Sequence, residues 1–298
     1  MEFLRKRVSP SHAGVALAVA AWAVFSLQDA IVKYLVIALP APEILFARSG
    51  LIIVVAALGA RRKDLLVATR PREASVILAR SIFILAAWIS YYTAARSLQL
   101  AELVTLYFAA PLFVVAMSRP LLGEIVGRWR WLATGLGFIG VVIAAKPQGG
   151  AQAAPVALAL FAALSWAITT VLARKLTATI STSAMMIGGN ALFFVVCGAM
   201  APALFVWPTP GETGLLIALG AIGGLAQALW IESLRRAQAS LLAPLEYSMF
   251  AYAVFWGWLV FGDWPTARTL IGAAIVLSAG LLAIGVEQRR TRIVQRKA

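Results

Sequence analysis

The chain carries one sequence pattern twice, in two copies that align at a constant offset. The copies cover residues 91–145 and 230–284, and an earlier pair of segments, 15–17 and 156–158, matches at nearly the same offset. The matched residues in the two halves are Lys33 with Arg174, Arg96 with Arg235, Gln99 with Gln238, and Gly123-Glu124 with Gly262-Asp263. A chain that is duplicated in this way is expected to fold as two similar halves.

The composition places both halves in a lipid bilayer. Hydrophobic residues form 62% of the 298 residues and charged residues 13%, and the mean hydropathy is +0.89. A soluble domain of this length needs far more charge to cover its surface, whereas a membrane-spanning helix takes about 20 apolar residues. We therefore predict an all-α polytopic membrane protein with ten transmembrane helices. They lie at about 14–34, 42–60, 74–95, 101–121, 129–147, 153–173, 181–204, 213–234, 240–261 and 267–286.

The number of spans in each half fixes how the halves relate. Five is an odd number, so the two five-helix repeats, residues 1–148 and 153–298, must enter the membrane from opposite sides. A Pro- and Gly-rich linker at 146–155 separates them. Inverted helical repeats are typical of transporters that work by alternating access, with a solute site near the bilayer midplane between the repeats.

The net charge of +14 suggests a nucleic-acid partner, but the placement of the charges argues against one. Of the 26 Lys and Arg residues, 20 fall in segments expected on the same side as the N-terminus. Four fall on the opposite side, namely Lys33, Arg96, Lys146 and Arg268. This split follows the positive-inside rule, with both termini cytoplasmic. We expect membrane lipids and a small-molecule solute as partners, no nucleic acid, and a monomer or weak homodimer.

The repeated element reads as a small-residue turn, an apolar helix, a Gly-acid pair and a Gly/Ala-rich helix, over residues 97–145 and 237–283. Together with Lys33 and Arg48, this element resembles the EamA-type branch of the drug/metabolite transporter superfamily over nearly the whole chain. Asp263 departs from the family pattern, in which Glu is commoner. The resemblance implies a ten-helix inner-membrane carrier of small metabolites, similar to the bacterial amino-acid exporters, including the aromatic amino-acid and paraquat exporter.

Candidate solute-binding residues come from positions that the repeat relates, because such positions lie at matching depths on opposite sides of the midplane. Where the two residues differ, the halves have diverged. In similar transporters the helices that carry these positions surround the cavity. Aromatic residues and Gln present apolar faces and polar edges to an organic solute, although aromatic residues also fill helix interfaces. The candidate pairs are Phe25 with Trp166, Trp88 with Gln227, Tyr91 with Trp230, and Tyr107 with Glu246.

Glu246 is the strongest single candidate. A charge near the bilayer centre costs about 2.5–3.5 kcal/mol, so it needs a partner or a wet cavity. Glu246 follows Pro244 by two residues and precedes Tyr247, which we add to the expected site. Its carboxylate is suited to bind a substrate amine or to carry a proton in exchange. Asp29 is the other candidate for a proton carrier, because the one histidine, His12, lies in the tail before the first span.

Two arginines are expected within spans, Arg48 in the second and Arg80 in the third. Arg48 can pair with Glu43 or Asp29 as a structural lock, and we favour that reading over contact with substrate. Arg80 is close enough to the inner face to extend its charge to the headgroups, and it is also able to seat a substrate carboxylate.

Two prolines, Pro111 and Pro244, fall inside predicted spans. Each frees a backbone carbonyl and bends its helix. In transporters such breaks often expose backbone to a cavity, but a static kink is an equally good reading. Glu124 and Asp263 begin the repeated turns at opposite membrane faces, and we interpret them as structural residues that cap the next helix.

Three other classes of protein fit the sequence less well. An intramembrane enzyme lacks support, because one His and one Cys, Cys197, give no His- or Cys-based metal site and we find no nucleophile with a neighbouring base. A primary pump would need a G-x-x-x-x-G-K-[ST] loop, which the sequence lacks. A passive channel is usually a ring of subunits. The sequence favours a carrier without cofactor or metal, in the first instance an amino-acid exporter, with nucleotide-like cofactors and drug-like cations as alternative solutes.

Overall fold

The computed structural model describes residues 12–60, 71–123, 127–144, 153–279 and 282, and every regular element in these ranges is helical. The predicted all-α class is confirmed for this part of the chain. The elements are α1 (His12–Ala38), α2 (Ala41–Leu58), α4 (Pro71–Ala95), α5 (Leu100–Tyr107), α6 (Ala109–Leu122), α7 (Arg128–Ala144), α8 (Ala153–Leu176), α9 (Thr182–Leu204), α10 (Pro210–Arg236), α11 (Ala239–Leu242), the 3-10 helix η4 (Ala243–Ser248) and α12 (Met249–Phe261). A further helix covers Ala267–Ala279. Glu124 and the centre of the predicted linker lie outside the described residues.

Seven helical segments are long and apolar enough to cross a membrane. They correspond to α1, α2, α4, the joined segment Leu100–Leu122, α8, α9 and α10. Three more apolar helices are shorter, namely Trp131–Gly140 within α7, Ala251–Phe261 within α12, and Ala267–Ala279. The prediction of a polytopic membrane protein is confirmed, whereas the count of ten spans stays a prediction.

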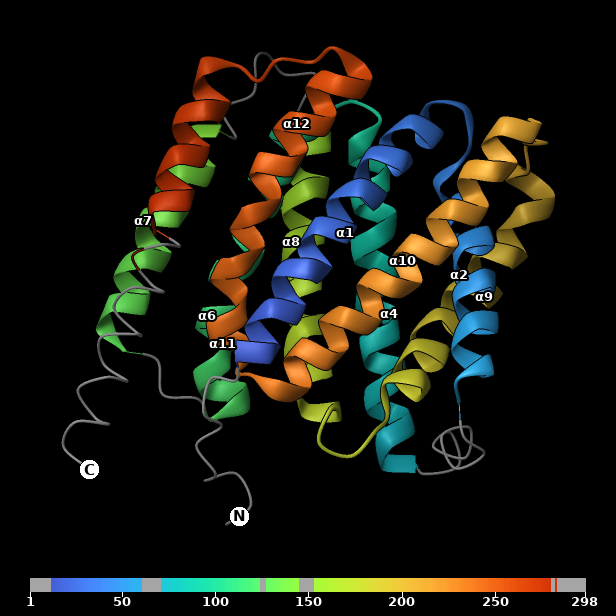
Figure 1. The fold of residues 1–298 in the computed structure, drawn as a ribbon, viewed down its shortest axis with the longest axis horizontal. Coiled ribbons are helices and arrows are strands. Elements are labelled where there is room, and N and C mark those ends of the chain that lie inside the picture. The colour runs from blue at the N-terminus through green and yellow to red at the C-terminus, as the bar shows by residue number, and fades with distance from the viewer. Residues whose placement is uncertain (1–11, 61–70, 124–126, 145–152, 280–281, 283–298) are drawn as a thin grey trace.

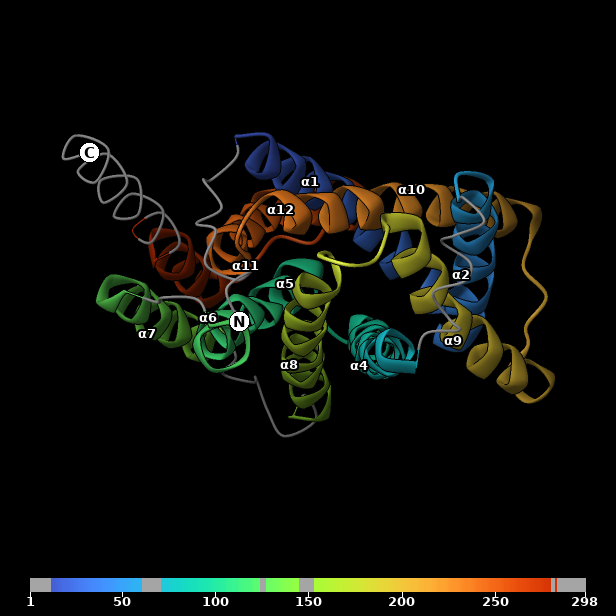
Figure 2. The same ribbon diagram turned by 90° about the horizontal axis from the view of Figure 1, so that it is seen from below.

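The long helices form pairs that join the first half of the chain to the second. α1 lies along α10, α4 lies along α8, and α2 lies along α9, as Figures 1 and 2 show from two directions. α7 lies at the opposite end of the molecule from α2 and α9. The interior of the bundle is therefore bounded by helices from both halves.

Two glycines allow helices to approach closely. A Cβ atom at Gly140 of α7 would lie 2.6 Å from the carbonyl oxygen of Gly272, and one at Gly220 of α10 would lie 2.6 Å from the side chain of Leu51. Both separations are too short for real atoms. Small residues let the backbones of membrane helices meet, and the packing at these two places depends on glycine.

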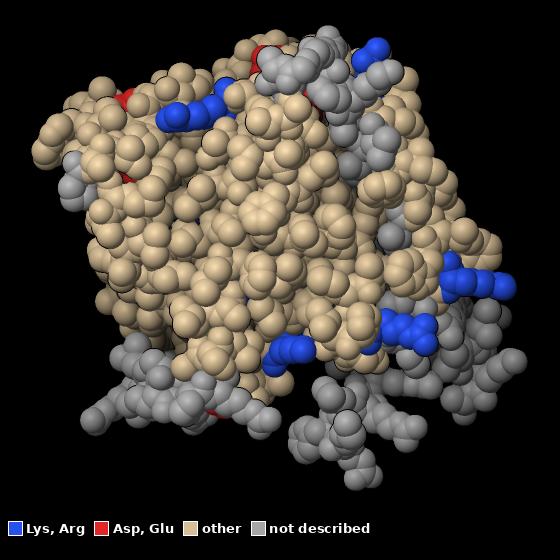
Figure 3. Space-filling model, turned by 180° about the vertical axis from the view of Figure 1, so that it is seen from behind, with Lys and Arg blue, Asp and Glu red and all other residues tan. Residues whose placement is uncertain are grey.

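Large apolar side chains cover the outside of the bundle. Val195, Ile37 and Leu58 expose 65%, 72% and 85% of their surface. On the face drawn in Figure 3, a broad tan band separates the charged groups near the two ends of the molecule. An apolar surface of this extent is unfavourable in water and fits a surrounding of lipid chains.

Two matched glycines share the same backbone geometry. Gly123 and Gly262 have φ angles of 66° and 67°, in the left-handed region, where α6 and α12 end. The N–H of each donates to the carbonyl oxygen four residues earlier, Arg119 in one half and Trp258 in the other, at 3.1 Å. Glycine adopts this conformation without strain, which explains why both Gly-acid pairs begin with it.

The predicted breaks at Pro111 and Pro244 both lie at interruptions of the α-helix. α5 ends at Tyr107 and α6 begins at Ala109, and Pro111 cannot donate to the carbonyl of Tyr107 four residues before it. In the second half, η4 replaces the α-helix around Pro244. Tyr107 is the last residue of α5, at the first interruption, and Glu246 lies in η4, at the second, and both side chains are buried.

Candidate functional site

A cavity lies in the middle of the bundle, between α1, α4, α5, α8 and α12. The space between its lining atoms is about 330 Å³, part of it open at the mouth. It is lined by Trp22, Phe25, Asp29, Ala87, Trp88, Tyr91, Tyr107, Trp166 and Met249. Five of the predicted aromatic residues therefore come together here, with Asp29. Trp22 and Met249 were missed by the sequence reasoning.

Trp166 lies at the centre of the aromatic cluster. Its ring centroid lies between 6.1 and 6.4 Å from those of five others: Trp22, Phe25, Trp88, Tyr107 and Trp230. Three of these contacts are edge-to-face, the arrangement that the ring quadrupoles favour. Because the rings already touch one another, a solute of more than a few atoms has to move them apart to enter.

Glu246 is buried beside this cluster, with 1% of its surface exposed. Its Oε1 atom has no hydrogen-bond partner among the described residues, and neither does Nε1 of Trp166. The indole of Trp166 faces the carboxylate, but the contact falls short of a hydrogen bond of ordinary geometry. Glu246 also interacts electrostatically with Asp29 and Tyr107. A buried carboxylate with an unpaired oxygen is costly and is suited to receive a cation or a proton.

Asp29 is held by a tyrosine from the neighbouring helix. The hydroxyl of Tyr91 donates to Oδ2 of Asp29 at 3.0 Å, and Asp29 is 4% exposed. The Tyr91 ring also packs edge-on against Tyr107, with centroids 5.1 Å apart. The cavity therefore has two carboxyl groups in its wall region, one with a hydroxyl donor and one without.

Arg48 is buried next to the cavity, where it interacts electrostatically with Asp29 but makes no direct ion pair with it. No ion pair joins Arg48 to Asp29 or Glu43 within the described ranges, and Glu43 instead accepts a hydrogen bond from the backbone N–H of Val206 at 2.9 Å. The guanidinium carbon lies 4.5 Å from the centroid of the Trp88 ring. The prediction of a pairing with Glu43 is wrong, because Glu43 lies at the start of α2 and turns to the segment before α10.

Arg80 lies away from the cavity lining. It is 2% exposed, which excludes the expected extension of its charge to the headgroups. A Cβ atom on Gly189 of α9 would lie 2.9 Å from one of its terminal nitrogens. Its backbone oxygen accepts from the hydroxyl of Thr169 at 3.5 Å.

Gln227 and Trp230 lie on α10 and reach different surroundings. Gln227 accepts from the side-chain amide of Asn190 at 2.8 Å and is not part of the cavity lining. Trp230 packs on Trp22, with centroids 4.7 Å apart.

The side chains of Tyr247 and Pro244 lie outside the described residues. Among the described residues, no group of three or more His, Cys, Asp or Glu side chains could hold a metal ion.

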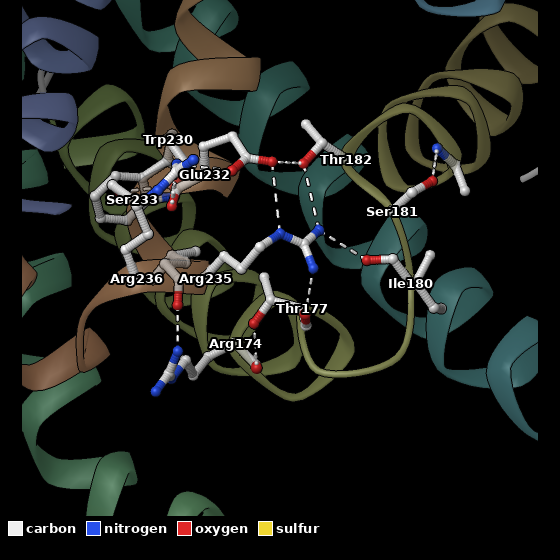
Figure 4. Close-up of polar contacts among 12 residues, drawn as sticks. Arg174, Thr177, Ile180, Ser181, Thr182, Trp230, Glu232, Ser233, Arg235 and Arg236 are labelled. Carbon is white, nitrogen blue, oxygen red and sulfur yellow. Dashed lines mark hydrogen bonds and ion pairs between the residues drawn. The ribbon is translucent and has the colours of Figure 1, made fainter. Parts of the chain in front are cut away.

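Polar contacts at the two ends of the bundle repeat each other. At one end Arg96 donates to the carbonyl oxygens of Val36 at 2.7 Å and Leu39 at 3.0 Å, a set we call the Arg96 clamp. At the other end Arg235 donates to the carbonyl oxygens of Thr177 at 2.5 Å and Ile180 at 2.8 Å, the Arg235 clamp. Figure 4 shows the guanidinium of Arg235 between this loop and Glu232. Glu232 forms an ion pair with it at 3.5 Å and accepts from the hydroxyl of Thr182.

A second basic residue reinforces each end. Lys33 donates to the carbonyl oxygen of Leu98 at 2.7 Å and lies 3.7 Å from Oδ2 of Asp263. Its counterpart in the repeat, Arg174, donates to the carbonyl oxygen of Leu234. Arg174 lies in the last turn of α8, where a cation is favourable, whereas Lys33 lies before the last turn of α1.

The comparisons with known proteins match this architecture. Residues 12–145 and 154–285 each match the EamA-like transporter family. The pseudopaline exporter CntI of Pseudomonas aeruginosa is 30% identical over 271 residues, which cover 89% of this chain and 94% of that protein. A crystal structure with 19% sequence identity has a TM-score of 0.71 and covers 94% of this chain and 99% of that chain, which supports the fold.

Two other groups of relatives align over a shorter stretch. A riboflavin transporter of Rhizobium johnstonii is 29% identical over 192 residues, 64% of each chain. An S-adenosylmethionine uptake transporter of Rickettsia bellii is 28% identical over 182 residues, 61% of this chain and 62% of that protein. The chain thus spans less than two thirds of the length of these two relatives.

Proposed function

Because the chain belongs to the EamA-like transporter family, we propose that it is a secondary or facilitative carrier that exports small metabolites with an amine, amino acids in the first instance. The family and its relatives support transport of small metabolites across a membrane. The choice of an amine rests on one observation above all, which is the buried Glu246 with an unpaired oxygen beside an aromatic cavity.

The chemistry around the cavity favours a cationic group. Among the described residues, no Lys or Arg lines it, whereas Asp29 does, and Glu246 lies beside it. Arg48 lies next to the cavity with its guanidinium over the Trp88 ring. The faces of Trp, Tyr and Phe rings attract cations through their quadrupoles, more strongly when water is excluded. An amine of the solute can therefore neutralise Glu246 while its apolar part displaces the rings around Trp166.

Matched contacts support two inverted five-helix repeats, 1–148 and 153–298, that together form ten spans. The repeat relates Arg96 to Arg235, and it also relates the acceptor carbonyls of one clamp to those of the other. Each clamp joins helices of one half, α1 with the end of α4 and α8 with α10. Rocking of these two units against each other would open the cavity to one side and then to the other.

The charges support a bacterial inner membrane with both termini in the cytoplasm. Arg174, Lys175, Arg235 and Arg236 gather at the Arg235 clamp, in the last turns of α8 and α10. The positive-inside rule assigns this end of the bundle to the cytoplasm and the Arg96 clamp to the outside.

A carrier of larger planar metabolites is the second candidate. It is favoured by the number of aromatic rings around Trp166 and by the relatives that transport riboflavin and S-adenosylmethionine. Such a solute would stack between rings and would depend less on Glu246 than a small amine does.

The test is uptake of a panel of labelled amino acids, riboflavin and S-adenosylmethionine into proteoliposomes, for the wild type and for Glu246→Gln. Glu73→Gln, which removes a carboxylate at the start of α4, is the matched control. We expect saturable uptake of at least one amino acid by the wild type and the control, and its loss in Glu246→Gln. Equal uptake by the wild type, Glu246→Gln and Glu73→Gln would show that transport does not depend on the Glu246 carboxylate. Uptake of riboflavin or S-adenosylmethionine without any amino acid would favour the second candidate.

A further inference from the structure

An ion pair joins the two halves of the chain at the end of the bundle that carries the Arg96 clamp. Nζ of Lys33, near the end of α1, lies 3.7 Å from Oδ2 of Asp263, which follows α12. Nζ also lies 5.3 Å from the centroid of the Phe261 ring, at the end of α12. The other ion pairs between described residues, those of Glu232, stay within α10. The contact between Lys33 and Asp263 therefore has to break when the halves separate at this end.

The backbone around Asp263 fixes the position of its carboxylate. Gly262 ends α12 in the left-handed conformation, and the N–H of Asp263 donates to the carbonyl oxygen of Gly257 at 3.0 Å. The helix that follows is capped by Thr266, whose hydroxyl accepts from an N–H of its first turn at 3.2 Å. The cap that we expected from Asp263 is thus made by another residue, and the Asp263 carboxylate lies against α1 instead.

A second carboxylate, on the first half itself, lies close enough to replace that of Asp263. Glu102, in the first turn of α5, attracts the Lys33 ammonium electrostatically, although no ion pair joins these two described residues. Lys33 stays bound to the first half in any case, because it donates to the carbonyl oxygen of Leu98, two residues before α5. An ammonium has three donors, so it can turn from one carboxylate to the other while that bond persists.

We propose that Lys33 is a switch between the halves, paired with Asp263 when the cavity is closed to the outside and with Glu102 when it is open. The switch rests on the proposed function, because it requires the halves to rock against each other. The Lys33 and Asp263 side chains are 12% and 30% exposed. An ion pair of this exposure shifts an equilibrium by roughly twofold to fivefold, which suits a contact that forms and breaks in every transport cycle.

The test measures how readily the cavity is reached from outside. Ala87, which lines the cavity, is replaced by Cys in a Cys197→Ala background, and its reaction with a small membrane-impermeant thiosulfonate is followed in spheroplasts. The variants compared in this background are Asp263→Asn and Glu102→Gln. Each removes one negative charge at the same end of the bundle, so a change in the attraction of the reagent would shift both rates in the same direction.

We expect the two variants to shift the rate in opposite directions. Asp263→Asn removes the partner of the closed state and should raise the rate about threefold, whereas Glu102→Gln removes the partner of the open state and should lower it by a similar factor. Asp263→Glu keeps a carboxylate and should stay within about twofold of the parent protein. Rates that shift in the same direction, or that do not change, would overturn the switch.

A second reporter checks the fold of each variant and the side that this end of the bundle faces. Trp207, which is 86% exposed in the segment before α10, is replaced by Cys in the same background and should react equally fast in every variant. A misfolded variant would react as fast at Ala87→Cys as at Trp207→Cys. No reaction at Trp207→Cys would overturn the assignment of this end to the outside. Because labelling involves no solute, loss of amino-acid uptake with the expected labelling would count against the proposed amine alone.

Discussion

The two ends of the bundle repeat each other, whereas its centre does not. Each clamp uses one arginine and two backbone carbonyl oxygens, at positions that the repeat relates. In the centre, the repeat pairs Tyr107 with Glu246 and Trp88 with Gln227, and the partners differ in charge, in polarity and in surroundings. Two regions of one duplicated chain have therefore diverged to different degrees.

The difference follows from what each region contacts. A clamp binds carbonyl oxygens, which are the same whatever the side chain, so it persists while the sequence around it changes. In the proposed function the centre contacts a solute, which approaches both halves at once and has no twofold symmetry. Residues of the clamps are expected to affect the stability of each unit, and residues of the centre to affect recognition.

The largest expected loss of stability comes from substitutions in the two clamps. Arg96→Ala removes two charge-assisted hydrogen bonds to carbonyl oxygens, and Arg235→Ala removes the two matching ones together with its contacts to Thr182 and Glu232. Because these arginines are partly exposed, we expect each substitution to lower the unfolding free energy by about 2 kcal/mol. The thermal midpoint in detergent should fall by similar amounts in both variants, and the double variant should lose roughly the sum because the sites are far apart. A severe loss in one variant with none in the other would break the equivalence of the ends.

A smaller effect is expected at Tyr91. Tyr91→Phe leaves Oδ2 of Asp29 buried without its donor, which costs about 1–2 kcal/mol. We expect the thermal midpoint to fall less than in the clamp variants, while the KM for transport changes several-fold. Tyr252→Phe, on α12, serves as a control that removes a hydroxyl away from the cavity lining. A change in stability without any change in KM would show that Tyr91 acts as packing.

The helices and the cavity were predictable from the sequence to different degrees. Hydropathy and the repeat locate helices because a membrane helix must be apolar over its whole length. The repeat also selected Phe25, Trp88, Tyr107 and Trp166, which the structure brings to one cavity. The repeat, however, matches positions that lie at equal depth in the membrane, and it does not tell which way their side chains point around the helix.

The direction in which a side chain points from its helix explains which residues the sequence reasoning misplaced or missed. Gln227 is related to Trp88 by the repeat, yet it turns to Asn190 on α9. Trp22 was missed, although it lies three residues before Phe25 and so on the same face of α1. That helical spacing was a usable signal. Arg80 could not be placed from sequence, because the glycine that makes room for it lies on another helix.

Trp166→Phe sharpens the contrast within the centre. The substitution keeps a ring at the middle of the cluster and removes the indole N–H that faces Glu246. Stability should change by about 1 kcal/mol or less, since a large ring is retained. The KM should rise a few-fold, because the carboxylate loses a neighbouring donor. Trp258→Phe, on the exposed face of α12, is the control, and an equal rise in KM there would indicate a general effect of losing an indole.

The smallest effect is expected from Lys33→Arg, which places in the first half the residue that the second half carries as Arg174. Lys33 donates to a carbonyl oxygen and lies 3.7 Å from Asp263, and arginine can make both contacts. Because a partly exposed ion pair contributes little, the unfolding free energy should change by less than about 0.5 kcal/mol and transport by less than about twofold. Lys33→Met is the comparison, and it should cost about 1 kcal/mol through the unpaired carbonyl. If Lys33→Arg lowered the unfolding free energy as much as Lys33→Met, the basic residues at the two ends would not be interchangeable. The two ends would then share their backbone arrangement but not their side-chain contacts.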